Sequence, residues 1–336
     1  MTVYTIRDIA RMAGVSVTTV SRVLNHRPDV NPQTREKVEK VIQECHFVGN
    51  ANARELKQGN DVIGMVVRGR SNPFLGSLAE AILAQVASGA DTYVTEYIDE
   101  ADDEFLTARH LSHRSHLKGL IFVGSRIDER VSAIQELDLP MVFTTVDGTY
   151  AAVRRASSVS IDDRAMGRLV GEELVKNGHK KIAVFGASPL AGDSLARRFH
   201  GFCEACAERG VTFDPDCYRE TRFSLQEGYD TAMEFFSVHP EVTALFGMSD
   251  TVAVGAMRAL RDMGKAVPGD VSVFGFDGID IGRFTVPSLS TVEQPVEEIA
   301  RCSVQLLDEM LDNAPPRNVT VQAVLRIRES LGPART

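Results

Sequence analysis

The chain has 336 residues, of which 43% are hydrophobic and 25% are charged. This composition is ordinary for a globular protein and excludes a disordered chain, a collagen and a disulfide-dense miniprotein. At about 100–200 residues per domain, the length predicts two or three domains. The sequence contains no run of about 18 apolar residues, so no membrane-spanning helix is expected. The charged N-terminus lacks the apolar segment of a secretory signal, so a cytoplasmic location is expected, where the five cysteines would be free thiols.

The charge is distributed unevenly along the chain. The formal net charge is −9, but residues 1–58 carry nine Lys or Arg against six Asp or Glu, a net charge of +3. The remainder therefore carries −12. A small basic head on a large acidic body suggests a polyanion-binding module joined to a domain with another task.

The head is predicted to form three short helices. Residues Thr5–Asp8 have the form of a capping box, and Gly14 ends the first helix because glycine enters the left-handed region without cost. Ser16 is the expected N-cap of a second helix over residues 17–24. Asn31 and Pro32 are the expected N-cap and first residue of a third. Three short helices with a four-residue turn between the first two are typical of a helix-turn-helix.

In a helix-turn-helix, the N-terminal end of the second helix enters the DNA major groove. Here that end carries Val17, Thr18 and Thr19, with Arg22 one turn later. An arginine can bond guanine bidentately, and Val or Thr methyls can contact the thymine methyl. Arg35, together with Lys37, is expected near phosphates. The alternative of a small helical bundle that docks on another molecule stays open at this point.

From residue 62 onward, strand-like and helical stretches alternate, which predicts βαβ units with parallel sheets covered by helices. The expected strands are Val62–Val67, Thr92–Tyr97, Gly119–Val123, Met141–Thr144, Lys181–Phe185, Ala244–Phe246 and Val271–Phe274. The expected helices include Leu75–Ser88, Arg164–Lys176, Ser194–Glu208, Leu225–Ser237 and Thr251–Met263. The span is long enough for two subdomains, with chain crossovers near Ser158–Ile161 and Ser288–Val292. Ligands of such folds bind beyond the carboxyl ends of the strands, so the cleft between the subdomains is the expected site.

No motif indicates an enzyme. The sequence contains no Gly-x-Gly-x-x-Gly after a strand, no P-loop and no Gly-x-Ser-x-Gly. His110, His113 and His116 recur every three residues and are expected at the surface end of a helix. Cys203 and Cys206 lie in mid-helix and are expected to be packing thiols. We therefore expect no catalytic residues, no metal and no cofactor.

The head and body together resemble the lactose-repressor (LacI)/galactose-repressor family of bacterial transcriptional regulators. In the head, the resemblance rests on Thr5–Asn25, Thr34–Glu44 and Asn50–Gln58. In the body, it rests on Ser71–Leu75, Val159–Gly167, Asn177–Ile182, Ala266–Asp270, Val273–Asp277 and Ser290–Gln294. The implied fold is α/β: a helix-turn-helix head (1–48), a hinge helix and linker (49–60), and an effector-binding and dimerisation domain (61–336). That last domain would contain two interleaved, doubly wound parallel-sheet subdomains resembling a type I periplasmic binding protein.

The resemblance also implies DNA contacts. The hinge leucine of the family wedges into the minor groove, and Leu56 stands at that position, whereas Gly49 replaces the usual proline before the hinge. Residues 50–58 are too few for a stable isolated helix, so the hinge is expected to be helical only when DNA and a partner copy support it. The implied DNA-binding residues are Thr5, Ser16, Val17, Thr18, Thr19, Ser21, Arg22, Asn25, Asn31, Arg35, Asn50, Ala53, Arg54 and Leu56.

The same comparison implies an effector site in the cleft. Arg198 would bond effector hydroxyls, Asp277 would accept from two hydroxyls, and Phe223 would stack on the ligand. The full implied set is Phe74, Leu75, Thr145, Ser194, Arg198, Phe223, Ser249, Asp277 and Gln294. Ser249 replaces a usual Asn and Thr145 a frequent Asp, and the chain has no Trp for sugar stacking.

The sequence thus predicts a homodimeric, sequence-specific DNA-binding regulator, a repressor, that binds a palindromic operator. A small molecule in the cleft, a sugar or sugar derivative, would control it. A nucleobase or other metabolite acting as corepressor is the alternative ligand. A sugar-binding module without DNA activity is the alternative class.

Overall fold

The computed structural model describes residues 6–24, 30–44, 62–86, 92–126, 134, 136–148, 153–187 and 194–335. The chain divides into two compact units, residues 1–60 and 61–336. The proposed hinge, residues 49–60, lies outside the described residues, as does Thr5 of the expected capping box.

The first unit contains the three predicted helices, α1 (Ile6–Ala13), α2 (Val17–Leu24) and α3 (Pro32–Glu44). Gly14 ends α1 with a φ of +63°, and the Val15 N–H donates to the Ala10 carbonyl at 3.0 Å, as in a Schellman motif. The Ser16 hydroxyl accepts from the Thr19 N–H at 3.1 Å, which confirms the expected cap. The core of this unit is made by Ile9, Ala10, Ala13, Val20, Val23, Val30 and Val38.

The first sheet of the second unit is parallel throughout. Its strand order is β11-β5-β4-β3-β1-β2. The strands are β1 (Val62–Arg68), β2 (Thr92–Ile98), β3 (Leu117–Val123), β4 (Met141–Thr144), β5 (Ala156–Ile161) and β11 (Asn318–Val321). The helices α5 (Pro73–Val86) and α12 (Val296–Leu311) contact one face, and α6 (Glu104–Arg114) packs against β1 and β3. Residues alternate accordingly: Met65 and Val67 join the core under α5, whereas Val66 packs with Phe105 of α6.

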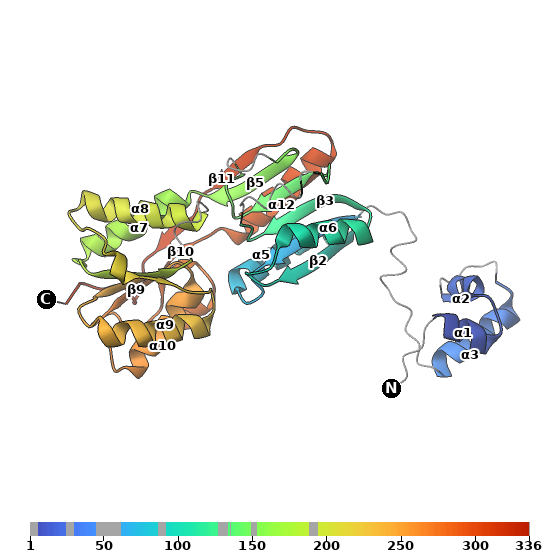
Figure 1. Cartoon of the computed structure of the whole chain (residues 1–336), viewed down its shortest axis with the longest axis horizontal. Helices are drawn as coiled ribbons and strands as arrows, with labels where there is room; N and C mark the ends of the chain where they lie inside the picture. Colours follow the sequence, from blue (N-terminus) through green and yellow to red (C-terminus); the bar gives the residue numbers. More distant parts are fainter. Residues whose placement is uncertain are drawn as a thin grey trace. The chain divides into compact units, whose positions relative to one another are not determined.

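The second sheet repeats this plan, with the order β12-β10-β9-β8-β6-β7. Its strands are β6 (Ile182–Gly186), β7 (Tyr218–Glu220), β8 (Ala244–Gly247), β9 (Ser272–Asp277), β10 (Ser290–Glu293) and β12 (Val324–Arg326). Its helices are α7 (Asp163–Lys176), α8 (Ser194–Glu208), α9 (Leu225–Val238), α10 (Asp250–Asp262) and the short α11 (Ile281–Phe284). Figure 1 shows α7 and α8 on one side of this sheet and α9 and α10 on the other. The edge strand β12 is antiparallel to β10, so the prediction of parallel sheets is wrong at this one strand.

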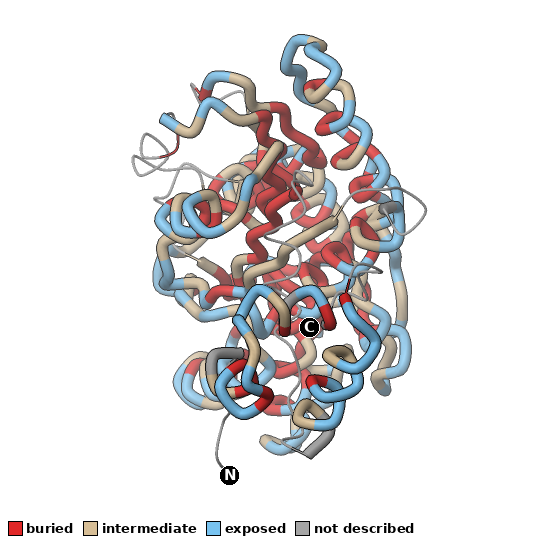
Figure 2. The backbone as a smooth tube through the Cα atoms, turned by 90° about the vertical axis from the view of Figure 1, so that its right-hand side faces the viewer, coloured by how far each residue is buried: buried red, intermediate tan, exposed pale blue. Residues whose placement is uncertain are grey.

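The chain crosses between the two sheets three times. The predicted crossovers at Ser158–Ile161 and Ser288–Val292 correspond to β5 and β10, each followed by an element of the other half. A third crossing, from β11 to β12 through residues 321–324, was not predicted. These two strands are short and carry exposed residues, so they have no clear hydrophobic periodicity. Figure 2 shows the buried residues gathered on the strands, while the outer sides of the helices are exposed.

Helices α7 and α8 approach each other unusually closely. A Cβ atom at Gly201 would lie 2.0 Å from the Arg164 carbonyl oxygen, and one at Gly167 would lie 1.9 Å from the Arg198 carbonyl oxygen. Only glycine fits at both positions, because larger residues would separate the two backbones. This contact fixes α8, and with it Arg198, against the end of β5.

The clustered histidines lie at the surface end of a helix, and the paired cysteines are packed in mid-helix, as the sequence predicts. His110 and His113 are exposed at the end of α6, and His116 follows it. Burial raises the pKa of the thiols of Cys203 and Cys206 to about 12, which suits packing rather than reactivity. Within the described residues, no group of three or more His, Cys, Asp or Glu side chains is arranged for a metal. No described helix combines the length and hydrophobicity that a membrane span requires.

Candidate functional site

The head presents the N-terminal end of α2 to solvent. Val17 is 41% exposed although it is apolar, and Thr18 and Arg22 are also exposed. The opposite side of the helix supplies Val20 and Val23 to the core. One packed side and one exposed side with methyl groups and a guanidinium is the arrangement that groove reading needs.

The other predicted head residues are placed as follows. Ser16 and Asn31 act as N-caps of α2 and α3, and Asn31 Oδ1 accepts from the Gln33 N–H at 2.9 Å. Thr19 and Arg35 are half-buried. The Ser21 side chain lies outside what the structure describes, and so do Thr5, Asn25, Asn50, Ala53, Arg54 and Leu56.

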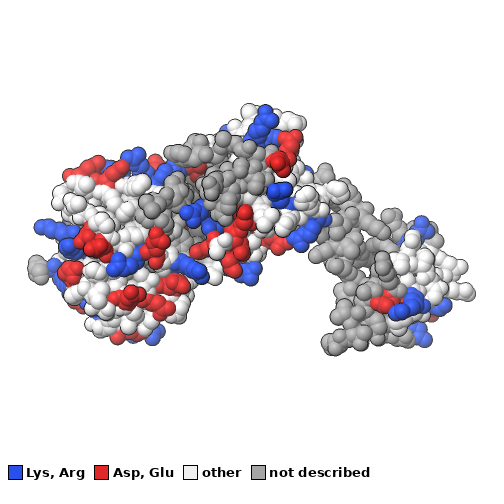
Figure 3. Space-filling model, in the orientation of Figure 1, with Lys and Arg blue, Asp and Glu red and all other residues white. Residues whose placement is uncertain are grey.

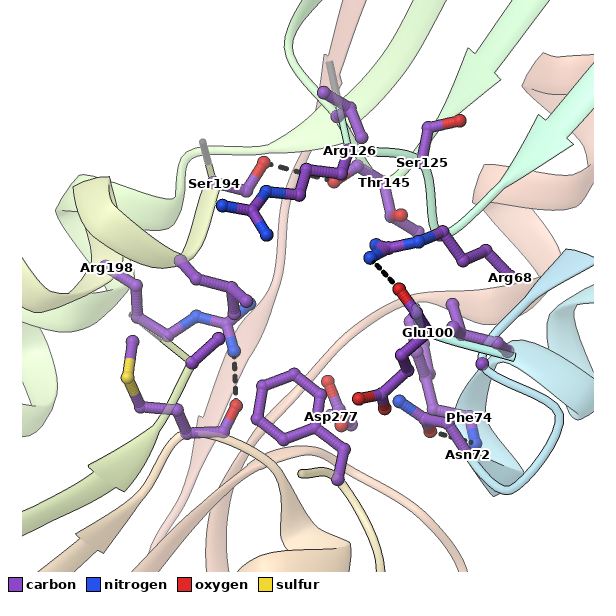
Figure 4. A pocket seen from close by; sticks show the side chains of 18 of the residues that line it. Arg68, Asn72, Phe74, Glu100, Ser125, Arg126, Thr145, Ser194, Arg198 and Asp277 are labelled. Atoms are coloured by element: carbon purple, nitrogen blue, oxygen red, sulfur yellow. Dashed lines mark hydrogen bonds between the residues drawn. The ribbon is translucent and has the colours of Figure 1, made fainter. Parts of the chain in front are cut away.

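The body contains a cavity of about 330 Å³ at the carboxyl ends of the strands of both sheets. Figure 4 shows its polar side chains converging on a central space. Eight of the nine predicted effector residues line it: Phe74, Leu75, Thr145, Ser194, Arg198, Phe223, Asp277 and Gln294. Ser249 is the exception. It is buried and lies outside the lining. Its hydroxyl caps α10 by accepting from the Thr251 N–H at 3.3 Å, and it lowers the pKa of the nearby Asp277.

Arg198 is the most firmly held polar group of the cavity. Its Nε and one terminal nitrogen donate to Asp163 Oδ1 at 3.2 and 2.8 Å, and the other donates to the Met248 carbonyl at 2.6 Å. Its Cζ lies 3.2 Å from the centre of the Phe276 ring. Burial raises the pKa of Asp163, although the nearby Arg198 opposes that shift. A guanidinium has five N–H donors, so up to two remain for a ligand.

Asp277 is the second fixed group. Its Oδ1 accepts from Gln294 Nε2 at 2.9 Å, and only 6% of the residue is exposed. The pKa of this carboxyl is raised to about 7, mainly by burial; Arg198 opposes the shift and Asp250 contributes to it. A buried carboxyl with a strongly raised pKa in a cleft is characteristic of a functional site.

Two cavity residues have backbone conformations that side chains disfavour. Thr145 has a φ of +68° and Asp277 a φ of +119°. Such strain costs on the order of 1–3 kcal/mol per residue and concentrates at ligand sites. The Ser194 hydroxyl donates to the Thr145 carbonyl at 3.2 Å, which links α8 to the loop after β4.

Several residues that line the cavity were not among the effector residues predicted from the sequence. They include Arg68, Asn72, Glu100, Ser125, Arg126, Asp163, Arg222 and Met248. Most of them lie at or just after the carboxyl end of a strand: Arg68 ends β1, and Met248 follows β8. The rule that ligands bind at this edge, applied strand by strand, would have found them.

Chemically, the cavity offers fixed hydrogen-bonding groups and two aromatic walls. Arg198, Asp277 and Gln294 supply donors and acceptors, while Phe74 and Phe223 supply apolar faces. Such a combination suits a ligand with several hydroxyl groups around an apolar ring face. A helix-turn-helix unit combined with an α/β unit that contains such a cavity defines a ligand-responsive DNA-binding regulator.

Comparison with known proteins agrees with this class. Residues 5–50 match the family model "Bacterial regulatory proteins, lacI family", and residues 171–331 match "Periplasmic binding protein-like domain". The chain is 32% identical over 312 residues to the ribose operon repressor of Halalkalibacterium halodurans, covering 93% of this chain and 91% of that one. The chain belongs to the lacI family of bacterial regulatory proteins, whose members are transcriptional regulators.

Solved structures show the same architecture. A transcriptional regulator CelR–cellobiose complex superposes with a TM-score of 0.72 at 26% identity, covering 97% of this chain and 99% of that one. A lac repressor dimer bound to operator and the anti-inducer ONPF gives a TM-score of 0.69 at 25% identity, covering 98% and 99%. Fold and family thus agree over nearly the whole chain.

Proposed function

We propose that the chain is a homodimeric repressor whose operator affinity is set by a sugar-like molecule in the body cavity. The observation that carries this proposal is the convergence of Arg198, Asp277 and Gln294 on one space at the strand ends. Hydroxyl groups can both donate to Asp277 and accept from Arg198. The cellobiose in the related CelR complex and the name of the ribose operon repressor support a sugar as the ligand class.

The head is proposed to read DNA through α2. Val17, Thr18, Thr19 and Arg22 would contact base edges, with Ser16, Ser21, Asn31 and Arg35 near the backbone. The hinge contacts implied by the family resemblance, with Leu56 as the minor-groove wedge, complete the proposal. Two heads on a palindrome require two copies of the chain.

An exposed apolar surface supports a second copy as the partner. Phe284 is 79% exposed and Val286 is 88% exposed, next to Ile281 at 47%. Apolar residues clustered on a surface are typical of protein interfaces. The lac repressor in the related structure is a dimer on its operator. Figure 3 shows acidic and basic side chains interspersed over the visible face of the α/β unit, so charge of one sign does not dominate that face.

The proposed action is binding without catalysis, in the cytoplasm where operator DNA lies. The ligand would shift the balance between two arrangements of the subdomains. Such coupling is reciprocal and typically about 1–3 kcal/mol.

The test is selection of DNA from a random library by the purified full chain, followed by gel-shift titration with and without a panel of sugars. We expect an inverted-repeat consensus and a change in its affinity of about 5- to 150-fold with one sugar class. If no inverted repeat is enriched, the proposal that the chain is an operator-binding repressor is refuted. A response to nucleobases alone would replace the sugar with the alternative ligand.

A further inference from the structure

Guanidinium groups are concentrated around the cavity. Among the described residues, Arg68, Arg126, Arg198 and Arg222 line it together with the carboxyl groups of Glu100, Asp163 and Asp277. The pair of Arg198 and Asp163, 2.8 Å apart, is neutral as a unit. Arg68, Arg126 and Arg222 share the described lining with Glu100 and Asp277, and burial raises the pKa of Asp277 to about 7. The described lining therefore offers several guanidinium groups to a ligand besides Arg198.

Arg68 has unused hydrogen-bonding capacity. It ends β1, and one terminal nitrogen donates to the backbone carbonyl of Glu100, which is a neutral acceptor. Its Nε is buried and has no acceptor among the described residues. Within that part of the chain, no carboxylate oxygen lies within 4 Å of its guanidinium. A buried donor without an acceptor is destabilising, so the site favours a ligand that supplies one.

Arg126 is aimed at the same space by the turn after β3. Its backbone N–H donates to Glu104 Oε1 at 2.9 Å, and the Ser125 hydroxyl donates to Glu104 Oε2 at 2.9 Å. Glu104, at the start of α6, is only 3% exposed and thus fixes this turn. Figure 4 shows the side chain of Arg126 entering the cavity from above and that of Arg68 from the right, with Asp277 below them. Arg68 and Arg126 therefore form an arginine end of the cavity, opposite Asp277.

We propose that the effector is a single-ring sugar or open-chain polyol that carries one anionic group, a carboxylate or a phosphate, bound by Arg68 and Arg126. This inference rests on the proposed sugar-responsive function and specifies its ligand class. The hydroxyl groups of the ligand face Asp277 and Arg198 at the other end. Guanidinium groups match the geometry of both oxyanions bidentately. A cavity of about 330 Å³ is at the lower end of the range for ligand pockets, which suits one ring and its anionic group.

The test compares matched ligands on the full-length protein. Glucose, galactose and ribose are each assayed beside their aldonate, their phosphate and, for the hexoses, their uronate, with inorganic phosphate alone as a further probe. Binding is followed by calorimetry and by the thermal midpoint, since only a ligand of the native state raises it. We expect an acidic or phosphorylated member to bind at least about 10-fold more tightly than its neutral sugar.

The possible outcomes separate the identity of the anionic group, the preference for an anionic ligand and the proposed sugar-controlled function. A response confined to the carboxylates or to the phosphates identifies the anionic group. A neutral sugar that binds as tightly as its anionic forms overturns the present inference and leaves the sugar-controlled repressor intact. If neither neutral nor anionic sugars bind while nucleobases do, the proposed ligand class itself is refuted.

Two variants test the arginine end. Arg68→Gln and Arg126→Gln should each weaken binding of the anionic ligand by about 10- to 100-fold, the loss expected for one charge-assisted contact. The matched control is Arg70→Gln. Arg70 is exposed, lies outside the cavity lining and donates to the Tyr97 carbonyl at 2.9 Å, so affinity should not change. Wild-type affinity in both cavity variants would overturn the inference, and Arg126→Gln carries the test alone if Arg68→Gln does not fold.

Discussion

The Asp277→Asn substitution is predicted to stabilise the ligand-free protein and to abolish its response to effector. Burial raises the pKa of this carboxyl from 3.8 to about 7. The unfolded chain therefore releases the proton at lower pH than the folded chain does, and stability is lost as the pH rises from about 4 to 7. Asparagine keeps the shape, accepts from Gln294 at the same oxygen, tolerates a positive φ and carries no charge.

The magnitude follows from linkage. A difference of about three pH units between the two pKa values, at about 1.36 kcal/mol each, gives an upper limit of about 4 kcal/mol at pH 8. At pH 5, the wild type has lost only about 2 kcal/mol of this stability, so the gain from asparagine is correspondingly smaller. Stabilisation at the expense of ligand binding is the usual trade at a binding site.

The assay is urea unfolding of both proteins at pH 5 and pH 8, with effector-dependent gel shifts in parallel. Asp214→Asn is the control of opposite sign. The pKa of Asp214 is lowered, first by the Asp216 N–H and then by Lys181, so loss of its charge should reduce stability at pH 8. A variant at 277 that is less stable than wild type at pH 8, or equally stabilised at both pH values, would refute the reasoning.

Three further predictions concern packing, DNA reading and assembly. Gly201→Ala should lower the free energy of unfolding by about 1–3 kcal/mol or more and weaken effector binding, because its Cβ would lie 2.0 Å from the Arg164 carbonyl oxygen. Gly76→Ala, which has no atom within 4 Å of the new Cβ among the described residues, is the control and should be neutral or slightly stabilising in urea unfolding. Arg22→Ala should cost about 1–3 kcal/mol at one operator base pair in gel shifts and relax specificity there, and unchanged specificity would contradict the role of α2. Phe284→Asp should convert the dimer to monomer in sedimentation, whereas Val238→Asp, at another exposed apolar residue, should not.

The head was largely predictable because its signals are local. Gly14, Ser16 and Asn31 each act through backbone groups within five residues, so sequence spacing determines the bond that forms. Periodicity also gave the α/β class and most strand positions. For one strand, however, periodicity predicted an end at residue 274, whereas β9 continues to Asp277 and thereby reaches the cavity.

The cavity was predictable only where a family motif marked it. Arg198 and Asp277 follow from the resemblance, but Arg68 and Arg126 do not. In the sequence, Arg68 is only a polar residue at a strand end. The strand order places the end of β1 beside that of β3, and the packing of the two sheets brings both to the same cavity as Asp277 at the end of β9. Ser249 was assigned to the ligand, yet its hydroxyl serves the α10 cap and Asp277. The hydroxyl of a short side chain at an N-cap accepts a backbone N–H of the helix, so it is not directed toward a ligand in the cavity.

The raised pKa of Asp277 also predicts how effector affinity depends on pH. If ligand hydroxyls donate to this carboxylate, binding requires its ionised form, so below pH 7 a proton must be released first. Affinity should then fall by up to about tenfold per pH unit below 7 and level off above it. The groups that face Asp277 and contribute to this shift are Arg198, Asp250, Ser249 and Gln294. Calorimetry in buffers of different ionisation enthalpy measures the released proton directly. An affinity that rises as the pH falls from 7 to 5.5 would show that Asp277 binds the ligand as the neutral acid, and the hydroxyl-accepting role would be wrong.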